Sequence, residues 1–155
     1  MKKNRATAML VGGAVLLAVV LLVWGRLNDP SRALVKNWKA IGVKCLPQGH
    51  VNLAQHIHLK LTVSMDGQLV AVPANIGQVK TCMSEMHTHD TSGTIHIESA
   101  EAGTTFTLGQ FFQVRGEPLD KNGYRLTATA DGQKIENPAE FILKDSQQII
   151  LEYQK

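Results

Sequence analysis

Histidine is the residue type of this chain whose number and spacing could do chemistry. All 6 histidines lie between positions 50 and 96 of a chain of 155 residues. Four of them form two His-x-His pairs, His56 with His58 and His87 with His89. In an extended strand, residues i and i+2 point to the same face about 6–7 Å apart, so both imidazoles of a pair can reach one ion. The spacing therefore indicates a metal site.

The strands that carry these histidines decide whether the side chains share a surface. His56 and His58 occupy the polar positions of an alternating apolar–polar stretch, as do His96 and Glu98 of a second stretch. If the two strands are neighbours, these four side chains lie on one face, and the loop between the strands supplies the second pair. Asp90 and Glu98 are further ligands or groups that orient the imidazoles. The predicted ligands are His56, His58, His87, His89 and His96.

The donor types indicate which ion such a site would take. Neutral imidazoles with carboxylates suit zinc(II) or copper(II), and we expect a copper or zinc ion as the cofactor. Met83 and Met86 flank the second pair and would permit copper(I), although methionine in a loop is more often a packing residue. The alternative is that the histidines are solvated side chains on the polar face of a strand.

Cys45 and Cys82 are the 2 cysteines of the chain. In a small exported domain they predict a disulfide that ties the start of the domain to the base of the histidine loop. The alternative is a Cys82 thiolate that binds the metal beside Met83 and His87.

Two β-hairpins form an internal repeat that must position these groups. Residues 61–74 and 126–139 match at an offset of 65, and each hairpin turns at an Asp-Gly pair. Each is followed by a Pro-Ala pair and then by an apolar strand with a glutamate, at 94–98 and 148–152. The second copy lacks the histidines, so the fold does not require them.

A short helix is predicted between the two copies, at residues 107–114. Thr105 or Thr107 can cap it, and Gly116 ends it. The element order predicts an α+β, mainly β fold, in which one short helix packs across a small mixed or antiparallel sheet of two duplicated hairpins and two single strands. The second half of this domain looks β-grasp-like.

Residues 6–25 carry no charged side chain, and their length matches the hydrocarbon core of a bilayer. We predict an uncleaved signal anchor, a single transmembrane helix, because no cleavage site follows Trp24. Lys and Arg are more numerous after this run than before it, which opposes a cytoplasmic N-terminus. The short N-terminal tail and the two cysteines instead favour a cytoplasmic N-terminus, with the domain outside. The predicted segments are a cytoplasmic tail and anchor at 1–27, a juxtamembrane helix or linker at 28–44, and a β-rich domain at 45–155 that faces the periplasm or exterior.

Charge and motifs exclude several classes of function. The net charge is only +3, the basic residues form no patch, and aromatics make up 5% of the chain, so no nucleic-acid partner is expected. The chain carries no dinuclear-hydrolase, cupin, Ser-His-Asp or phosphate-loop motif, and we expect no enzyme. Metal-dependent catalysis stays open as an alternative, because an open metal position needs no further motif.

Several of these stretches resemble a family of exported or membrane-anchored bacterial and archaeal proteins that has no established activity. The resemblance runs from about Cys45 to Tyr153. The family places a tryptophan-glycine pair after the helix, where this chain has Val114-Arg115-Gly116. The motifs are His56-Ile-His58-Leu, Pro73-Ala-Asn-Ile-Gly77, Cys82, His87-Thr-His-Asp-Thr-Ser-Gly-Thr-Ile-His-Ile-Glu-Ser99 and Phe106-Thr-Leu-Gly-Gln-Phe-Phe112.

The sequence as a whole is typical of a membrane-tethered, extracytoplasmic metal-binding protein that acts in sequestration, delivery or sensing of copper or zinc. Its expected partners are the membrane, through the N-terminal helix, and a membrane protein or metallochaperone. One alternative is a β-grasp-like interaction module of a membrane complex with a structural histidine loop. A second alternative is a metal-dependent enzyme.

Overall fold

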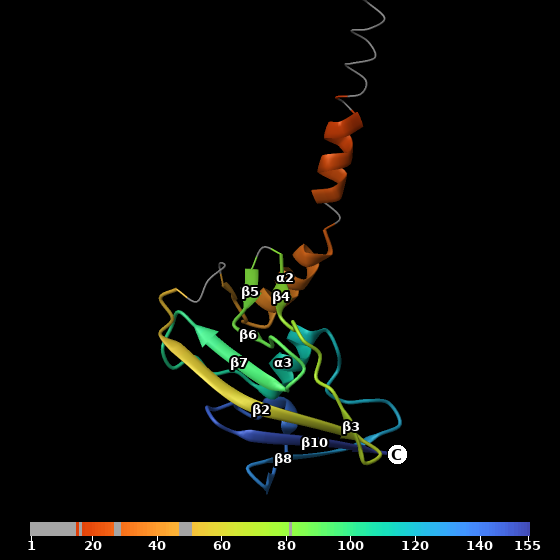
Figure 1. The fold of residues 1–155 in the computed structure, drawn as a ribbon, viewed down its shortest axis with the longest axis vertical. Coiled ribbons are helices and arrows are strands. Elements are labelled where there is room, and N and C mark those ends of the chain that lie inside the picture. Colours follow the sequence, from red (N-terminus) through yellow and green to blue (C-terminus); the bar gives the residue numbers. More distant parts are fainter. Residues whose placement is uncertain (1–14, 16, 27–28, 47–50, 81) are drawn as a thin grey trace, which may run out of the picture. The chain divides into compact units, whose positions relative to one another are not determined.

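The chain divides into two compact units, Met1–Ala33 and Leu34–Lys155. In the first unit residues 17–26 are helical. The structure describes residues 15, 17–26, 29–46, 51–80 and 82–155. Among these residues, no helix is both long enough and apolar enough to cross a membrane. The predicted anchor at 6–25 lies partly outside those residues and stays a prediction. The structure is a computed structural model and is shown in Figure 1.

A seven-stranded sheet is the main body of the second unit. Its strands lie in the order β6-β7-β2-β10-β8-β9, and β3 pairs with β2. Figure 1 shows β7, β2, β10 and β8 side by side. Strands β2 and β10 are parallel, whereas the other neighbours are antiparallel. The predicted mainly β class is confirmed. The strands are β2 (Gln55–Met65), β3 (Gln68–Val70), β6 (Met86–His87), β7 (Thr94–Ser99), β8 (Arg125–Ala130), β9 (Gln133–Lys134) and β10 (Gln148–Gln154).

Both predicted hairpins are present, as β2–β3 and β8–β9. Asp66 and Gly67 have φ values of 47° and 78°, and Asp131 and Gly132 have φ values of 51° and 79°. Positive φ at both central residues is the type I′ turn that the Asp-Gly pairs predict. The returning strands β3 and β9 are shorter than expected, at 3 and 2 residues.

Helix α3 (Leu108–Arg115) lies where the sequence predicts the packing helix. Of the two candidate caps, Thr107 is the one used. Its hydroxyl accepts from the Gln110 backbone N–H, and its own N–H donates to the Gln110 side chain. The αL residue Gly116 ends the helix. Phe111 and Phe112 are buried in the core that the helix shares with the apolar face of the sheet.

A second sheet of three short strands was not predicted. Its order is β1-β5-β4, with β1 at Cys45–Leu46, β4 at Gln78–Val79 and β5 at Cys82–Ser84. A disulfide joins Cys45 to Cys82, whose Cα atoms are 5.7 Å apart. The predicted disulfide is therefore confirmed, and Cys82 has no thiolate to offer a metal.

Helix α2 (Pro30–Ala40) contributes to the core of the second unit through its last turn. Trp38 is 1% exposed, and its indole N–H donates to the Val114 carbonyl at 3.3 Å. Val43 is fully buried in the same cluster. The core thus includes residues that precede Cys45, where the sequence places the start of the domain.

Candidate metal centre

Three neighbouring strands align a row of histidines on one face of the main sheet. His96 of β7 lies opposite His58 of β2 on one side and opposite His87 of β6 on the other. Side chains directly opposite each other in antiparallel strands have Cβ atoms about 4.5–5.5 Å apart. The His96 ring centroid is accordingly 4.5 Å from that of His58 and 5.3 Å from that of His87. The expected neighbouring position of β2 and β7 is confirmed.

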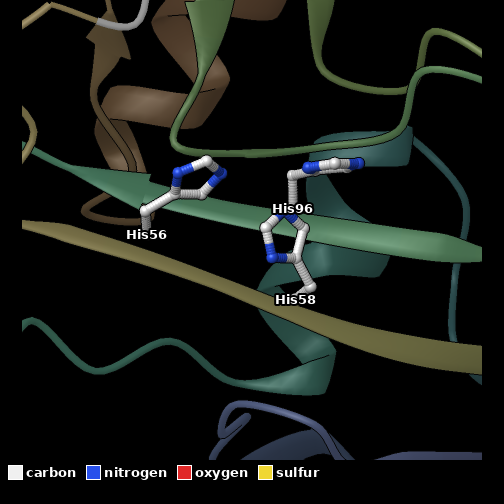
Figure 2. Close-up of side chains that lie close together, drawn as sticks. All are labelled: His56, His58 and His96. Atoms are coloured by element: carbon white, nitrogen blue, oxygen red, sulfur yellow. The ribbon is translucent and has the colours of Figure 1, made fainter.

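These side chains form two groups that could each hold a metal ion. The outer triad is His56, His58 and His96, whose imidazoles lie close together on β2 and β7 (Figure 2). The inner triad is His87, His89 and His96. In each triad one nitrogen from every ring lies within 4.8 Å of the others, and His96 belongs to both. All five predicted ligands therefore lie in one cluster.

The Nε2 atoms of His87 and His89 are 3.3 Å apart. Zn–N bonds of about 2.0–2.1 Å in a tetrahedral site place two ligand nitrogens about 3.3 Å from each other. The distance between the two nitrogens therefore equals that of two ligands on one zinc ion, although in the metal-free protein a hydrogen bond joins them. A nitrogen of His96 lies within 4.8 Å of the ligand nitrogens of both and is the third donor of this group.

A chain of hydrogen bonds fixes the protons of this pair. The Gln78 amide nitrogen is 2.8 Å from the Thr88 carbonyl, which only accepts, and 3.3 Å from His89 Nδ1. His89 Nδ1 therefore accepts, and its Nε2–H donates to Nε2 of His87. The Nδ1–H of His87 in turn donates to the Ser84 carbonyl at 3.1 Å. His87 thus carries its lone pair at Nε2, where it accepts from His89. His89 must shift its ring proton to Nδ1 before both Nε2 atoms can bind one ion.

Burial keeps the central rings of the cluster neutral. His87 is 0% exposed, and burial lowers its pKa from 6.5 to about 4, although the charge of Glu98 acts in the opposite direction. Partial burial, followed by the charges of His58 and His89, lowers the pKa of His96. Both rings are therefore uncharged at neutral pH, where the second ring proton does not compete with a metal ion.

The two predicted carboxylates differ in their surroundings. Glu98 is fully buried, and its Oε1 is 3.1 Å from Nε2 of His56, the residue opposite it on β2. It can orient that ring or add negative charge beside an ion. Asp90 is exposed and accepts from the Ser92 N–H at 2.8 Å, and hydrogen bonds from Ser92 lower its pKa. Its carboxylate is engaged in the turn of the loop.

The remaining candidates around the second pair do not join the cluster. Met86 is fully buried and lies opposite Ile97, on the core face of the sheet. It therefore packs, as expected for methionine near a loop. His50 lies outside the described residues.

Thr88 holds the loop of the second pair in place, a role that the sequence did not reveal. Its buried hydroxyl donates to the Pro73 carbonyl at 2.8 Å and accepts from the Ile76 N–H at 3.1 Å. The Pro-Ala-Asn-Ile-Gly motif at 73–77 is thereby tied to the residue between His87 and His89. Neither Thr88 nor Gln78 stands in a periodic pattern. The glycine of the motif was the one available signal of a tight backbone approach.

The fold and the cluster together define a small α+β domain whose histidines could bind a metal ion. No protein-family model matches the chain, and neither the curated proteins nor the solved structures include a match to it. The resemblance to exported and membrane-anchored proteins stays a prediction from the motifs.

Proposed function

We propose that this chain is a membrane-tethered protein that binds zinc or copper outside the cytoplasm, for sequestration, delivery or sensing of the ion. The observation that carries the proposal is the register of β6, β7 and β2, which sets His87, His96 and His58 opposite one another. A fold that needed only a stable sheet would gain nothing from three adjacent imidazoles on one face.

The character of the donors supports zinc or copper over harder ions. Neutral imidazole nitrogens suit these two metals, whereas calcium and magnesium take oxygen ligands. Glu98 supplies a buried negative charge beside the histidines, which offsets part of the charge of a divalent ion. The 3.3 Å spacing of the His87 and His89 nitrogens is the spacing of two ligands on tetrahedral zinc.

The location of the protein rests on two features. Residues 6–25 form an uncharged apolar stretch of the length that spans a bilayer. The Cys45–Cys82 disulfide persists in oxidising compartments such as the periplasm or cell exterior. A domain tethered there can take up an ion and pass it to a membrane protein or a metallochaperone.

Metal content of the purified protein tests the proposal. The full chain in detergent is stripped with a chelator, exposed to zinc or copper, dialysed and analysed by inductively coupled plasma mass spectrometry. We expect about one ion per chain, as for a closed site of three or four ligands. The double variant His87→Ala/His89→Ala should bind at least about 100-fold more weakly, since loss of even a supporting residue costs 10–100-fold.

His50→Ala is the control, because this histidine stands outside both His-x-His pairs, and its metal content should equal that of the parent. A parent chain that stays metal-free after both loadings would contradict metal binding and metal-dependent catalysis alike, and would leave the interaction module. A double variant that binds like the parent would show that the ion lies elsewhere.

A further inference from the structure

Glu98 is a carboxylate buried beside the histidines of both triads. It is 0% exposed and lies opposite His56, with its Oε1 3.1 Å from Nε2 of that ring. On its own strand β7 it stands two residues from His96, so the two side chains are on one face about 6–7 Å apart. Because His96 belongs to both triads, an ion in either triad lies close to Glu98.

The charge of Glu98 acts strongly on these rings because water does not reach the carboxylate. Coulomb interactions are several times stronger in a buried site than in water. Burial lowers the pKa values of His87 and His96, and the charge of Glu98 opposes that effect at both rings. Lys60, on the same face of β2 as His58, is exposed, so water weakens the effect of its positive charge.

Glu85 is the second carboxylate buried in this region, and different groups hold it. It accepts from the Lys44 backbone N–H at 2.7 Å and from the Ser99 hydroxyl at 2.8 Å. Neither of these donors belongs to a histidine. Among the described residues, Glu98 is therefore the buried carboxylate that contacts a candidate ligand imidazole.

The second copy of the repeat carries a glutamate at a similar place but without the histidines. Glu152 of β10 lies opposite Ser64 of β2, on the same polar face of the sheet, and is exposed. Ser64 is six residues from His58, which is about 20 Å along an extended strand. The burial of Glu98 thus accompanies the histidines, and Glu152 offers a matched comparison.

The described cluster offers nitrogen and oxygen donors, without the sulfur that copper(I) prefers. Met86 packs in the core, and Cys82 is part of the disulfide. Met83 lies on β5, between Leu46 and Gln78 of the small sheet. The donor set is therefore better suited to a divalent ion.

We propose that Glu98 makes the metal centre selective for a doubly charged ion, zinc(II) or copper(II), over copper(I). A fixed negative charge stabilises a bound ion in proportion to the charge of that ion, so its effect on the binding free energy is twice as large for a divalent ion. The imidazoles are neutral and bind both oxidation states of copper. The inference rests on the proposed metal binding and adds the charge of the ion.

A role through charge differs measurably from a role in holding the His56 ring. Glu98→Gln removes the charge but keeps the size of the side chain and its ability to hydrogen-bond. If loss of the charge weakens copper(I) binding tenfold, it weakens binding of a divalent ion about 100-fold, because the two free energies differ twofold. Loss of ring position alone would weaken both ions by similar factors.

The test measures the affinity of the full chain in detergent for each ion by competition with a chromophoric chelator. Copper(I) is supplied as its acetonitrile complex without a thiol reductant, so that the disulfide stays intact. Glu98→Gln should bind zinc(II) about 100-fold and copper(I) about tenfold more weakly than the parent. The reduction potential of bound copper should then rise by about 59 mV, the tenfold difference for a one-electron couple.

Glu152→Gln is the matched control, and it should leave both affinities and the potential unchanged. Glu98→Met is a second neutral variant of similar volume and should raise the potential in the same direction. Equal weakening of both ions in Glu98→Gln, or an unchanged potential in both Glu98 variants, would overturn the selection by charge. A parent chain that binds no zinc or copper at all would instead contradict the proposed function itself, so the two failures are distinguishable.

Discussion

His87 links the stability of the metal-free protein to pH, because its ring is held neutral inside the fold. Burial lowers its pKa to about 4, from an ordinary value of 6.5 that an unfolded chain would keep. Between these values the unfolded state binds more protons than the folded state, so stability falls as pH falls. The contribution is complete above pH 6.5 and is lost as pH decreases toward 4.

We expect the metal-free full chain to lose roughly 2–3 kcal/mol of unfolding free energy between pH 7 and pH 4.5 through this one group. Urea denaturation at the two pH values measures the loss. His87→Gln keeps a polar side chain that does not titrate, so the variant should lose less over the same interval. Equal losses in parent and variant would mean that His87 takes up no extra proton on unfolding.

At the residue scale, the sequence predicted the chemistry but not the supports. The five histidines could be named because His-x-His spacing in a strand is itself a geometric statement. Gln78, Thr88 and the Ser84 carbonyl act through contacts with the second pair that no local pattern encodes. These contacts depend on the folded position of the loop beside β6, so the sequence alone does not predict them.

At the element scale, strand length decided what could be predicted. Strands β2, β7 and β10 have 11, 6 and 7 residues, long enough for a period of two to be recognised. Strands β1 and β4 have 2 residues each and carry no periodicity, so the small second sheet went unpredicted. The strand that carries His87 is equally short, and its pairing with β7 depends on tertiary contacts.

Gly77 is one such contact, since it lies against β6 where only glycine fits. Its φ is +72°, and an added Cβ would overlap the Met86 carbonyl and lie 3.0 Å from the Ser84 Cβ. Gly103 has a similar φ of +74° but has nothing within 4 Å of an added Cβ. Both Gly→Ala changes therefore introduce left-handed strain of roughly 1–2 kcal/mol. Only the change at Gly77 also pushes on the strand that carries His87.

We expect Gly77→Ala to destabilise the chain by about 1–3 kcal/mol more than Gly103→Ala, the usual cost of overpacking. Because Met86 precedes His87, the displaced strand should also weaken zinc binding, by about tenfold as for loss of a supporting residue. Urea denaturation and zinc titration of both variants measure these effects. If the two variants behave alike, the close approach of Gly77 to β6 does not position the metal centre.

At the scale of the whole molecule, the burial of Trp38 indicates where the folded domain starts. Trp38 falls within residues 28–44, which the sequence predicts to be a juxtamembrane helix or linker. The structure buries this side chain against α3, with its indole N–H on the Val114 carbonyl. A second link runs from the Gln110 side chain to the Ile41 carbonyl at 2.8 Å. Helical spacing alone could not distinguish a face on lipid from a face on protein.

The last prediction compares the two tryptophans of the chain. Trp38→Ala removes a buried indole and should cost about 3–5 kcal/mol of unfolding free energy, the usual loss for a large core residue. Trp24 is 65% exposed, and Trp24→Ala should change stability by no more than about 0.5 kcal/mol. Urea denaturation of the full-length variants, with the disulfide intact, measures both. For the same reason the fragment Leu34–Lys155 should unfold cooperatively, whereas Cys45–Lys155 lacks both Trp38 and Val43 and should be markedly less stable. Equal stability of the two fragments would mean that the folded domain starts at Cys45.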